Sequence, residues 1–469
     1  MLRGIPELLV PQYPIGYETI TYYAPAMMTF SKRSLLDVFA NAFQASPLAN
    51  VDQPLLKTFR AGPLFYVLMW LVSVFTEAHA YSILKVVGPL LYGCLAVSFF
   101  VFLKRGLDVD GKMAFVAALL LIFQVAALRE SWDRFRNVLG LIFAFATLTT
   151  LRSDGRFKWS LVTGLAVLTA LSRQYIGLVL FVAVLGFAFL ERKDRTASLI
   201  ALAPALAVFT VMVYPTKLWW NVVAGGAPPH YSGNYLSVLQ DVSSIFAVCY
   251  IPLLPFVVKG FKRDRLLDPM LSLLLLGSFS VIVSPWFAVR GYQRWLILLV
   301  FPFGVYAAEG FNRFHLFDKR NFRKFVAVLL LFMVVGVGYS SGAFSYVALP
   351  NSWVPTNLVQ SSIAWSQIDD VKDIFEWLDE NAITDSSILS EERFYGWTLI
   401  YLKRANNDVE VIPYGANSPP DPALEKALSD GFRCIYLIWY TDSSLENFQI
   451  VYSQNSVSIF RYEPQAAQF

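Results

Sequence analysis

Residue types suited to proton transfer and phosphate binding gather in four short segments of this 469-residue chain. The first segment, residues 14–25, places Glu18 among the tyrosines Tyr17, Tyr22 and Tyr23. A carboxylate in this setting could take a proton from an acceptor hydroxyl or hold a divalent cation. The alternative interpretation is an ordinary loop acid among aromatic residues at a membrane surface.

The second segment, residues 129–137, combines two acids with three arginines. Glu130 and Asp133 are three residues apart, so on a helical turn they share one face and are candidate proton acceptors. Each arginine can hold a phosphate group through two parallel hydrogen bonds. These arginines are Arg129, Arg134 and Arg136. The alternative is a loop whose acids and arginines form salt bridges only with one another.

Two pairs of cations and one histidine complete the set. Lys57 and Arg60 precede one apolar run, and Arg290 and Arg294 open another. A cation at the mouth of a membrane span can bind a lipid phosphate, or it can simply extend to the interface. His230 lies in a loop rich in glycine and proline and could contact a substrate, although a lone loop histidine is usually just solvated.

The composition decides which environment must position these residues. Hydrophobic residues make up 56% of the chain and charged residues 15%, with a mean hydropathy of +0.51. Soluble domains contain about 25% charged residues. A chain this apolar cannot bury its surface in one aqueous core, so the bilayer must be its main solvent. The net charge of +4 comes from short basic clusters between apolar runs, which is a topology signal rather than a nucleic-acid surface.

Several function classes lack their sequence signatures here. The three cysteines, Cys94, Cys249 and Cys434, form no CxxC pair and no Cys/His ligand spacing, which argues against a disulfide framework or a zinc site. No P-loop, GxGxxG, GxSxG or HExxH motif is present in the sequence. Nucleotide hydrolysis and metalloprotease chemistry therefore lack support.

The apolar runs predict about ten membrane-spanning helices. Several runs are shorter than the ~20 residues of a full span, so their ends should extend into the flanking loops. If ten spans alternate, most loops rich in lysine and arginine fall on one side, which should be cytoplasmic. The arginine-rich residues 129–136 and 290–294 fall on the opposite, outer side. The predicted spans are 81–103, 112–128, 137–151, 158–172, 174–190, 196–215, 243–260, 268–288, 293–309 and 323–345.

The segments flanking this bundle complete the predicted architecture. Residues 61–76 are predicted to form a re-entrant or interfacial helix, preceded by an amphipathic helix at 27–43. Beyond the last span, alternating strand and helix patterns predict a small α/β domain with a partly parallel sheet. The expected strands are 386–390, 409–412, 433–440 and 456–461, and the expected helices 371–380, 394–403 and 421–429. The domains are thus an outer loop with juxtamembrane helices (1–80), a transmembrane domain (81–345) and an extracytoplasmic α/β domain (346–469).

These segments, in this order, resemble the membrane glycosyltransferases of the GT-C class, especially archaeal and bacterial relatives of dolichyl-phosphate-mannose protein mannosyltransferases. Gly16-Tyr17-Glu18 is similar to the acidic motif of the family's first outer loop, and Gly62-Pro63-Leu64-Phe65-Tyr66 to the start of its juxtamembrane helix. Residues 129–137 resemble the second outer loop, which carries another acid. Residues 290–294 resemble the late arginine that meets the donor phosphate.

The WWDYG-like motif of oligosaccharyltransferases is absent, which argues against transfer of a whole oligosaccharide. The chain departs from the family pattern at two points. Glu18 stands where the family usually has aspartate, which bears on the catalytic or metal-binding role carried over to it. The family's first transmembrane helix has no counterpart ahead of residues 61–76. We expect either an apolar run of ~20 residues encoded upstream of Met1 or the loss of that helix.

The resemblance implies an enzyme of the cell membrane that transfers a sugar from a polyprenyl- or dolichyl-phosphate donor to a hydroxyl of a glycan, lipid or protein on the outer face. Glu18, Asp133 or Glu130 would deprotonate that hydroxyl, with inversion at the sugar carbon. The donor phosphate would lie against cations that stabilise the leaving group, namely Lys57, Arg60, Arg290 and Arg294. Further substrate contacts would come from Tyr17, Tyr22, Arg129, Arg134 and His230. The resemblance implies no certain cofactor, and a divalent cation, Mg²⁺ or Mn²⁺, is the candidate.

Two other function classes stay open. A polytopic transporter or lipid flippase predicts ionisable residues near the membrane midplane or inverted repeats. Lys85 and Arg173 lie near predicted span ends, and no repeat is visible. A structural or assembly subunit with a degenerate site is the third class, and the glutamate at position 18 is compatible with it. The residues suited to proton transfer and phosphate binding gather at one membrane face, which favours an enzyme over a transporter.

Overall fold

The computed structural model of the protein describes most of the chain. The described residues are 2–10, 15–24, 26–27, 34, 62–76, 80–191, 194–213, 235–283, 292–343, 358–402, 409–415, 419–441, 445 and 447–462. Within these ranges several side chains are not described, and those of Tyr22 and Asp133 are among them. The predicted amphipathic helix at 27–43 therefore lies almost wholly outside the described residues.

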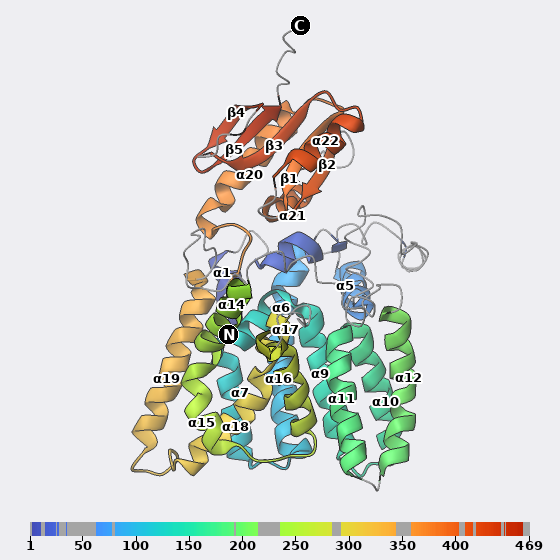
Figure 1. The fold of residues 1–469 in the computed structure, drawn as a ribbon, viewed down its shortest axis with the longest axis vertical. Helices are drawn as coiled ribbons and strands as arrows, with labels where there is room; N and C mark the ends of the chain where they lie inside the picture. The colour runs from blue at the N-terminus through green and yellow to red at the C-terminus, as the bar shows by residue number, and fades with distance from the viewer. Residues whose placement is uncertain are drawn as a thin grey trace.

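Helices packed side by side form the larger part of the molecule, and a smaller domain with a β-sheet sits on one end of this bundle (Figure 1). That end is called the domain end below. The bundle helices are α6 (Ala80–Val101), α7 (Gly111–Phe123), α8 (Val125–Asp133), α9 (Phe135–Leu151), α10 (Lys158–Ser172), α11 (Gln174–Leu190), α12 (Arg195–Val213), α14 (Tyr235–Tyr250), α15 (Leu254–Gly260), α16 (Leu267–Val283), α17 (Tyr292–Leu298), α18 (Val300–Arg313) and α19 (Phe322–Gly338).

Five helical stretches among the described residues can cross a membrane by length and composition. They are Tyr81–Gly106, Arg195–Val213, Val238–Gly260, Tyr292–Arg313 and Phe322–Gly342. A sixth arises if α7 and α8, which are bent by 63° at their junction, count as one broken span. The structure thus shows five or six such helices where the sequence predicts about ten. The remaining predicted spans form apolar helices of only 10–17 residues, below the length criterion for a span.

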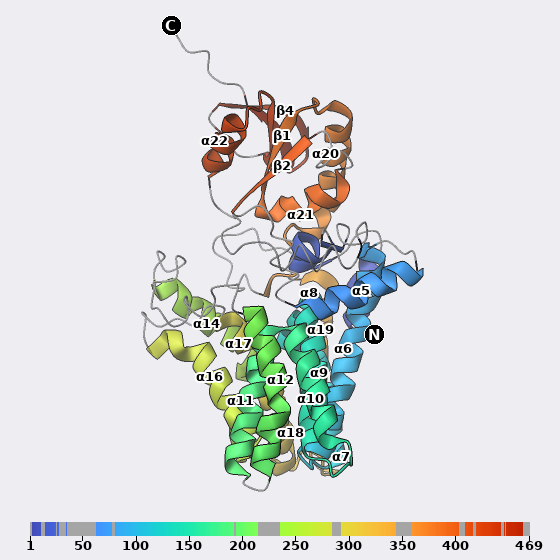
Figure 2. The same cartoon turned by 90° about the vertical axis from the view of Figure 1, so that its right-hand side faces the viewer.

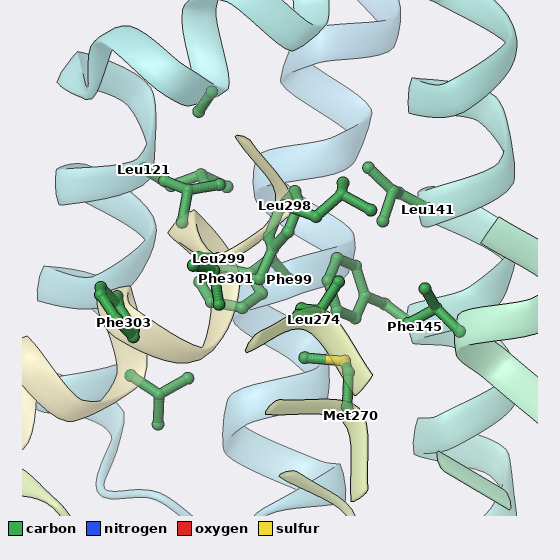
Figure 3. Packing of buried hydrophobic residues seen from close by; sticks show 14 of the residues in the cluster. Phe99, Leu121, Leu141, Phe145, Met270, Leu274, Leu298, Leu299, Phe301 and Phe303 are labelled. Atoms are coloured by element: carbon green, nitrogen blue, oxygen red, sulfur yellow. The ribbon is translucent and has the colours of Figure 1, made fainter. Parts of the chain in front are cut away.

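Aromatic and aliphatic side chains fill the interior of the bundle (Figure 3). The ring centroids of Phe99, Phe145 and Phe301, from α6, α9 and α18, lie 5.1–5.6 Å apart. Because lipid tails are as apolar as these side chains, close packing rather than transfer from water must hold the helices together. Met270 and Leu274 of α16 join the same packed layer, so the cluster connects four helices (Figure 3).

The break between α7 and α8 directs a polar helix across the domain end. Gln124 has an extended backbone (φ −77°, ψ 129°), and its side-chain oxygen accepts a hydrogen bond from the N–H of Ala126 at 2.8 Å. Its amide also donates to the carbonyl oxygen of Cys249. At Gly336 of α19 an ideal Cβ would lie 2.6 Å from the carbonyl oxygen of Phe123, so only glycine allows this close approach. The broken helix is therefore fixed from two sides.

The N-terminal segment closes the far end of α8. This segment contains η1 (Leu2–Gly4), α1 (Ile5–Leu9) and η2 (Thr19–Tyr23). The guanidinium of Arg3 donates to the carbonyl oxygens of Ser131 and Trp132 at 3.3 and 2.9 Å. These carbonyls belong to the last turn of α8, where the backbone C=O groups have no hydrogen-bond donor within the helix. Glu7 pairs with Arg3 at 2.8 Å within the same segment, so the segment is bound to α8 by hydrogen bonds from a charge-neutralised, buried arginine.

The C-terminal domain confirms the predicted α/β pattern. Its elements are η10 (Trp365–Gln367), α20 (Ile368–Asn381), β1 (Ser386–Glu391), α21 (Glu392–Tyr401), β2 (Val409–Tyr414), α22 (Asp421–Ser429), β3 (Ile435–Tyr440), β4 (Phe448–Gln454) and β5 (Val457–Tyr462). The strand order is β2-β1-β3-β5-β4, with β1 parallel to β2 and β3, and β5 antiparallel to its two neighbours. Helices α20 and α21 cover one face and α22 the other. Strand β4 is not among the strands predicted from the sequence.

One more helix, α5 (Pro63–Thr76), lies at the domain end of the bundle (Figure 2). It has 14 residues and belongs to the shorter apolar helices of 10–17 residues, as do four of the predicted spans. The η2 turn, α5 and the upper end of α9 meet the C-terminal domain in one continuous apolar cluster. The domain therefore stands directly over the residues that the sequence singled out.

Candidate functional site

Arginines from several distant segments surround Glu18 at the domain end of the bundle. One carboxylate oxygen of Glu18, Oε1, lies 3.9 Å from Nε of Arg134 and 3.6 Å from Nη2 of Arg294. Arg136 and Arg173 add further positive charge near the same carboxylate. The contributing segments are the residues before η2, the α8–α9 junction, the α10–α11 junction and the start of α17. The structure thus brings together three residues chosen from the sequence, Glu18, Arg134 and Arg294.

These arginines determine the charge state of Glu18. Burial by itself raises the pKa of this carboxyl group, because an enclosed site disfavours the charged form. The positive charges of Arg294 and Arg134, followed by those of Arg136 and Arg173, outweigh burial and lower the pKa to about 2. Glu18 is therefore ionised throughout the neutral range and lies as an anion inside a cationic pocket.

Glu130 fixes the orientation of Arg134. Its side chain is completely buried, and Oε2 lies 3.1 Å from Nη1 of Arg134. The other oxygen, Oε1, accepts hydrogen bonds from Asn137 at 2.5 Å and from the hydroxyl of Tyr175 at 3.2 Å. Because both oxygens are occupied, these contacts favour a positioning role for Glu130 over the proton-accepting role predicted from the sequence.

Tyrosines hold Arg136 in place. Its Nε donates a hydrogen bond to the hydroxyl of Tyr23 at 3.0 Å. The guanidinium carbon lies 5.2 Å from the ring centroid of Tyr23 and 5.8 Å from that of Tyr66, within the range of cation–π attraction. Tyr23 packs in turn against Phe65 and Phe135, each with ring centroids 5.3 Å apart. Side chains from η2, α5 and α9 thus pack together around this cation.

Arg173 differs from the other arginines of the pocket in its polar contacts. Its side chain is only 9% exposed, and among the described residues its guanidinium makes no hydrogen bond or ion pair. It lies 5.5 Å from the ring of Tyr175. Burial, and then the like charges of Arg136 and Arg294, lower the pKa of Arg173 to about 10. Since arginine remains protonated in proteins, Arg173 is a buried positive charge that the nearby carboxylate of Glu18 only partly offsets.

Asp241 anchors the segment that carries Arg294. Its Oδ2 accepts hydrogen bonds from the hydroxyl of Tyr292 at 2.8 Å and from the amide of Gln293 at 3.2 Å. Helix α14 therefore fixes the first turn of α17, and Arg294 follows directly. The side chain of Arg294 is 41% exposed, which makes it the most accessible cation of the pocket. Asp241 could not be recognised from the sequence, because it stands at the edge of an apolar run.

The other residues predicted from the sequence divide into two groups. Tyr17 is half-buried beside Glu18, and Arg129 is buried with 5% exposure on α8. The remaining candidates lie outside the described residues or have undescribed side chains. These are Tyr22, Lys57, Arg60, Asp133, His230 and Arg290. In the described part of the chain, no group of three His, Cys, Asp or Glu side chains could hold a metal ion.

Gly62 controls how closely α5 approaches the pocket. An ideal Cβ at this position would lie 2.2 Å from the carbonyl oxygen of Ser172 and 2.7 Å from Cδ of Arg136. Both distances are far below van der Waals contact, so a side chain here must displace α5 or Arg136. The absence of a side chain at Gly62 therefore sets the distance between α5 and the pocket.

We expect Gly62→Ala to reduce any activity of this site about 10²-fold, the typical cost of a 1 Å misplacement of groups in an active site. Gly164→Ala is the matched control. Gly164 lies in α10 of the same bundle, and nothing lies within 4 Å of its ideal Cβ. Activity should be measured on detergent-purified protein per folded molecule. Equal activity of the two variants would show that the contact does not shape the pocket.

Comparison of the sequence with known proteins does not assign the chain to a family. No family model matches the chain, and no curated protein is similar to it. The residues of the pocket are therefore the evidence for the reaction that it supports. Its arginines can hold an anion with several oxygens through charge-assisted hydrogen bonds, and Glu18 places a carboxylate next to that anion.

Proposed function

We propose that the protein is a membrane glycosyltransferase that moves a sugar from a polyprenyl-phosphate donor to an acceptor hydroxyl on the outer membrane face. In this proposal the ten apolar helical segments all cross the membrane in a GT-C-like arrangement, and the α/β domain is extracytoplasmic. The single observation that carries the proposal is the convergence of Arg134, Arg136, Arg173 and Arg294 around Glu18. A lipid-borne phosphate reaching the end of the bundle would meet this cationic pocket.

The reaction that fits these residues is an inverting displacement. The acceptor hydroxyl gives its proton to Glu18 while its oxygen attacks the anomeric carbon from the side opposite the phosphate. The bond between that carbon and the phosphate oxygen breaks, and the polyprenyl phosphate leaves with the electron pair. Arg173 and Arg294 stabilise the charge that develops on it, because their guanidinium groups are already held in the pocket.

Binding of the donor also accounts for the basicity of Glu18. In the unliganded pocket the arginines lower its pKa to about 2, which makes it a weak proton acceptor. The donor is a phosphodiester with one negative charge, and when it is bound to Arg173 and Arg294 that charge offsets part of the positive charge and so raises the pKa of Glu18. The carboxylate therefore becomes a better base only after the donor is in place.

The direct test is sugar transfer by the purified protein. The protein in detergent or nanodiscs is mixed with a polyprenyl-phosphate sugar carrying a radiolabelled hexose, together with lipid, glycan and peptide acceptors. Product that requires both donor and acceptor supports the proposal. If the labelled donor instead crosses proteoliposome membranes without loss of its sugar, a flippase is the correct function. Binding of the donor with neither outcome would indicate a non-catalytic subunit.

We expect chelation of divalent cations to leave the rate of sugar transfer unchanged. The positive charge around Glu18 opposes the binding of a cation such as Mg²⁺ or Mn²⁺ at this carboxylate. The measurement compares initial rates with EDTA alone and with EDTA plus excess MnCl₂. A rate that falls with EDTA and returns with Mn²⁺ would place a required metal elsewhere in the site.

A further inference from the structure

Helix α21 of the C-terminal domain touches the backbone of the turn that follows Glu18. At Gly396 an ideal Cβ would lie 2.2 Å from the carbonyl oxygen of Ile20 and 2.7 Å from Cα of Thr21. Only the absence of a side chain lets α21 and η2 approach so closely. The contact joins a segment near the start of the chain to one about 375 residues later.

Apolar side chains extend this contact into a shared core. Ile20 and Tyr23 of η2 are at most 1% exposed, and they belong to the same cluster as Phe394 and Trp397 of α21. Trp397 is held in turn by a hydrogen bond from its Nε1 to the hydroxyl of Ser362 at 3.0 Å. The η2 turn is therefore packed between the C-terminal domain on one side and the rings of α5 and α9 on the other.

A second contact fixes the beginning of the domain to the bundle. The hydroxyl of Tyr339, which follows α19, donates to the carbonyl oxygen of Leu358 at 3.0 Å. The ring of Trp365 stacks on that of Trp132 in α8, with centroids 6.4 Å and planes 18° apart. With two separate points of attachment, the domain is held in one orientation over the pocket.

We infer that the C-terminal domain is a structural part of the candidate site, in which α21, through Gly396, holds η2 and so positions Glu18 against Arg134 and Arg294. Gly396 is then a positioning residue located in a different domain from the cations it serves. The packing alone supports the positioning of Glu18 by α21. The effect of this positioning on sugar transfer rests on the proposed function.

The positional part can be tested without any enzyme assay. A cysteine is introduced by Glu18→Cys in a Cys94→Ser background, since Cys94 is the exposed one of the three native cysteines. The rate of its reaction with a maleimide is compared with and without Gly396→Leu. We expect Gly396→Leu to raise the labelling rate about 10-fold or more, because local opening exposes the turn. The matched control is Gly164→Leu, which should leave the rate unchanged, and an unchanged rate in Gly396→Leu would overturn the inference.

The catalytic part has its own signature. Gly396→Leu, measured with the native Glu18, should lower kcat about 10²-fold while the affinity for farnesyl phosphate stays the same or increases, since the displaced carboxylate no longer competes for Arg134 and Arg294. A purely structural defect would instead weaken binding and lower the melting temperature together, which contradicts the inference.

Two further outcomes keep the proposals distinguishable. If Gly396→Leu raises labelling but the wild-type protein transfers no sugar, the proposed function fails and the positional inference stands. If Gly396→Leu aggregates on size exclusion, Ile20→Ala replaces it, because Ile20 is fully buried in the same contact from the opposite side. Ile20→Ala should then show the same rise in labelling, and no rise would overturn the inference.

Discussion

Glu18→Gln should lower the rate of sugar transfer about 10²- to 10⁴-fold, the usual contribution of a positioned acid or base. The same variant should bind polyprenyl phosphate more tightly than the wild-type protein does. Glu18 is an internal anion that competes with the donor phosphate for Arg134 and Arg294. Removing its charge ends this competition while deleting the proton acceptor. The rate is measured by transfer of labelled sugar, and the affinity by titration with farnesyl phosphate.

Two variants and the pH dependence control this experiment. Glu7→Gln also removes a buried, cation-paired glutamate at the same end of the molecule, and it should lower stability but not the rate per folded molecule. Asp133→Asn tests the second acid predicted from the sequence. Because the pKa of Glu18 is lowered to about 2, its carboxylate stays ionised as the pH falls from 8 to 5 and is protonated only near pH 2. Donor binding should therefore show no change from Glu18 in that range. Wild-type transfer rates in both Glu18→Gln and Asp133→Asn would refute the assignment of the base.

Arg173→Gln should make the protein more stable and less able to bind its donor. Arg173 is only 9% exposed, lies beside other arginines and makes no ion pair among the described residues. Removing such a charge relieves repulsion and desolvation. We expect a rise in melting temperature of about 1–3 °C. Loss of one or two charge-assisted hydrogen bonds to phosphate should raise the donor KM about 10- to 100-fold.

The conservative variant Arg173→Lys separates charge from geometry. Lysine keeps the positive charge but not the planar fork that holds phosphate through two bonds, so the donor KM should lie between those of the wild type and Arg173→Gln. Melting temperatures are measured by tryptophan fluorescence in detergent. A lower melting temperature and an unchanged KM in Arg173→Gln would show that this arginine stabilises the fold and does not bind the donor.

The C-terminal domain was the part of the fold most accessible from the sequence. Its strands and helices alternate in short, clearly separated patterns, and the predicted helix at 421–429 matches α22. Strand β4 was missed because it lies at the edge of the sheet and much of it is exposed, so its residues show no buried alternation. The number of spans was less predictable. Helices such as α10, with 15 residues, are largely apolar but shorter than the length that defines a span.

The site was predictable only where charged residues gather in one segment. Glu18 and Arg134 stood out because their neighbours in sequence are also polar or aromatic. Arg173 and Asp241 carry no such local signal, since each stands alone next to an apolar run. Their role depends on which helix ends lie together, and that follows from the packing of the whole bundle. The positioning role of Glu130 likewise depends on Tyr175, which lies 45 residues away in sequence.

The unequal lengths of the bundle helices have a consequence for the surrounding lipid. With a rise of 1.5 Å per residue, the 15 residues of α10 extend about 22 Å and the 26 residues of Tyr81–Gly106 about 39 Å. In the proposed ten-span arrangement, one flank of the protein is thus shorter than a hydrocarbon core of about 30 Å. The bilayer should become thinner along that flank to match it. Arg173 follows the last residue of α10, so a lipid-borne donor arriving through the thinned leaflet brings its headgroup down to the level of the pocket.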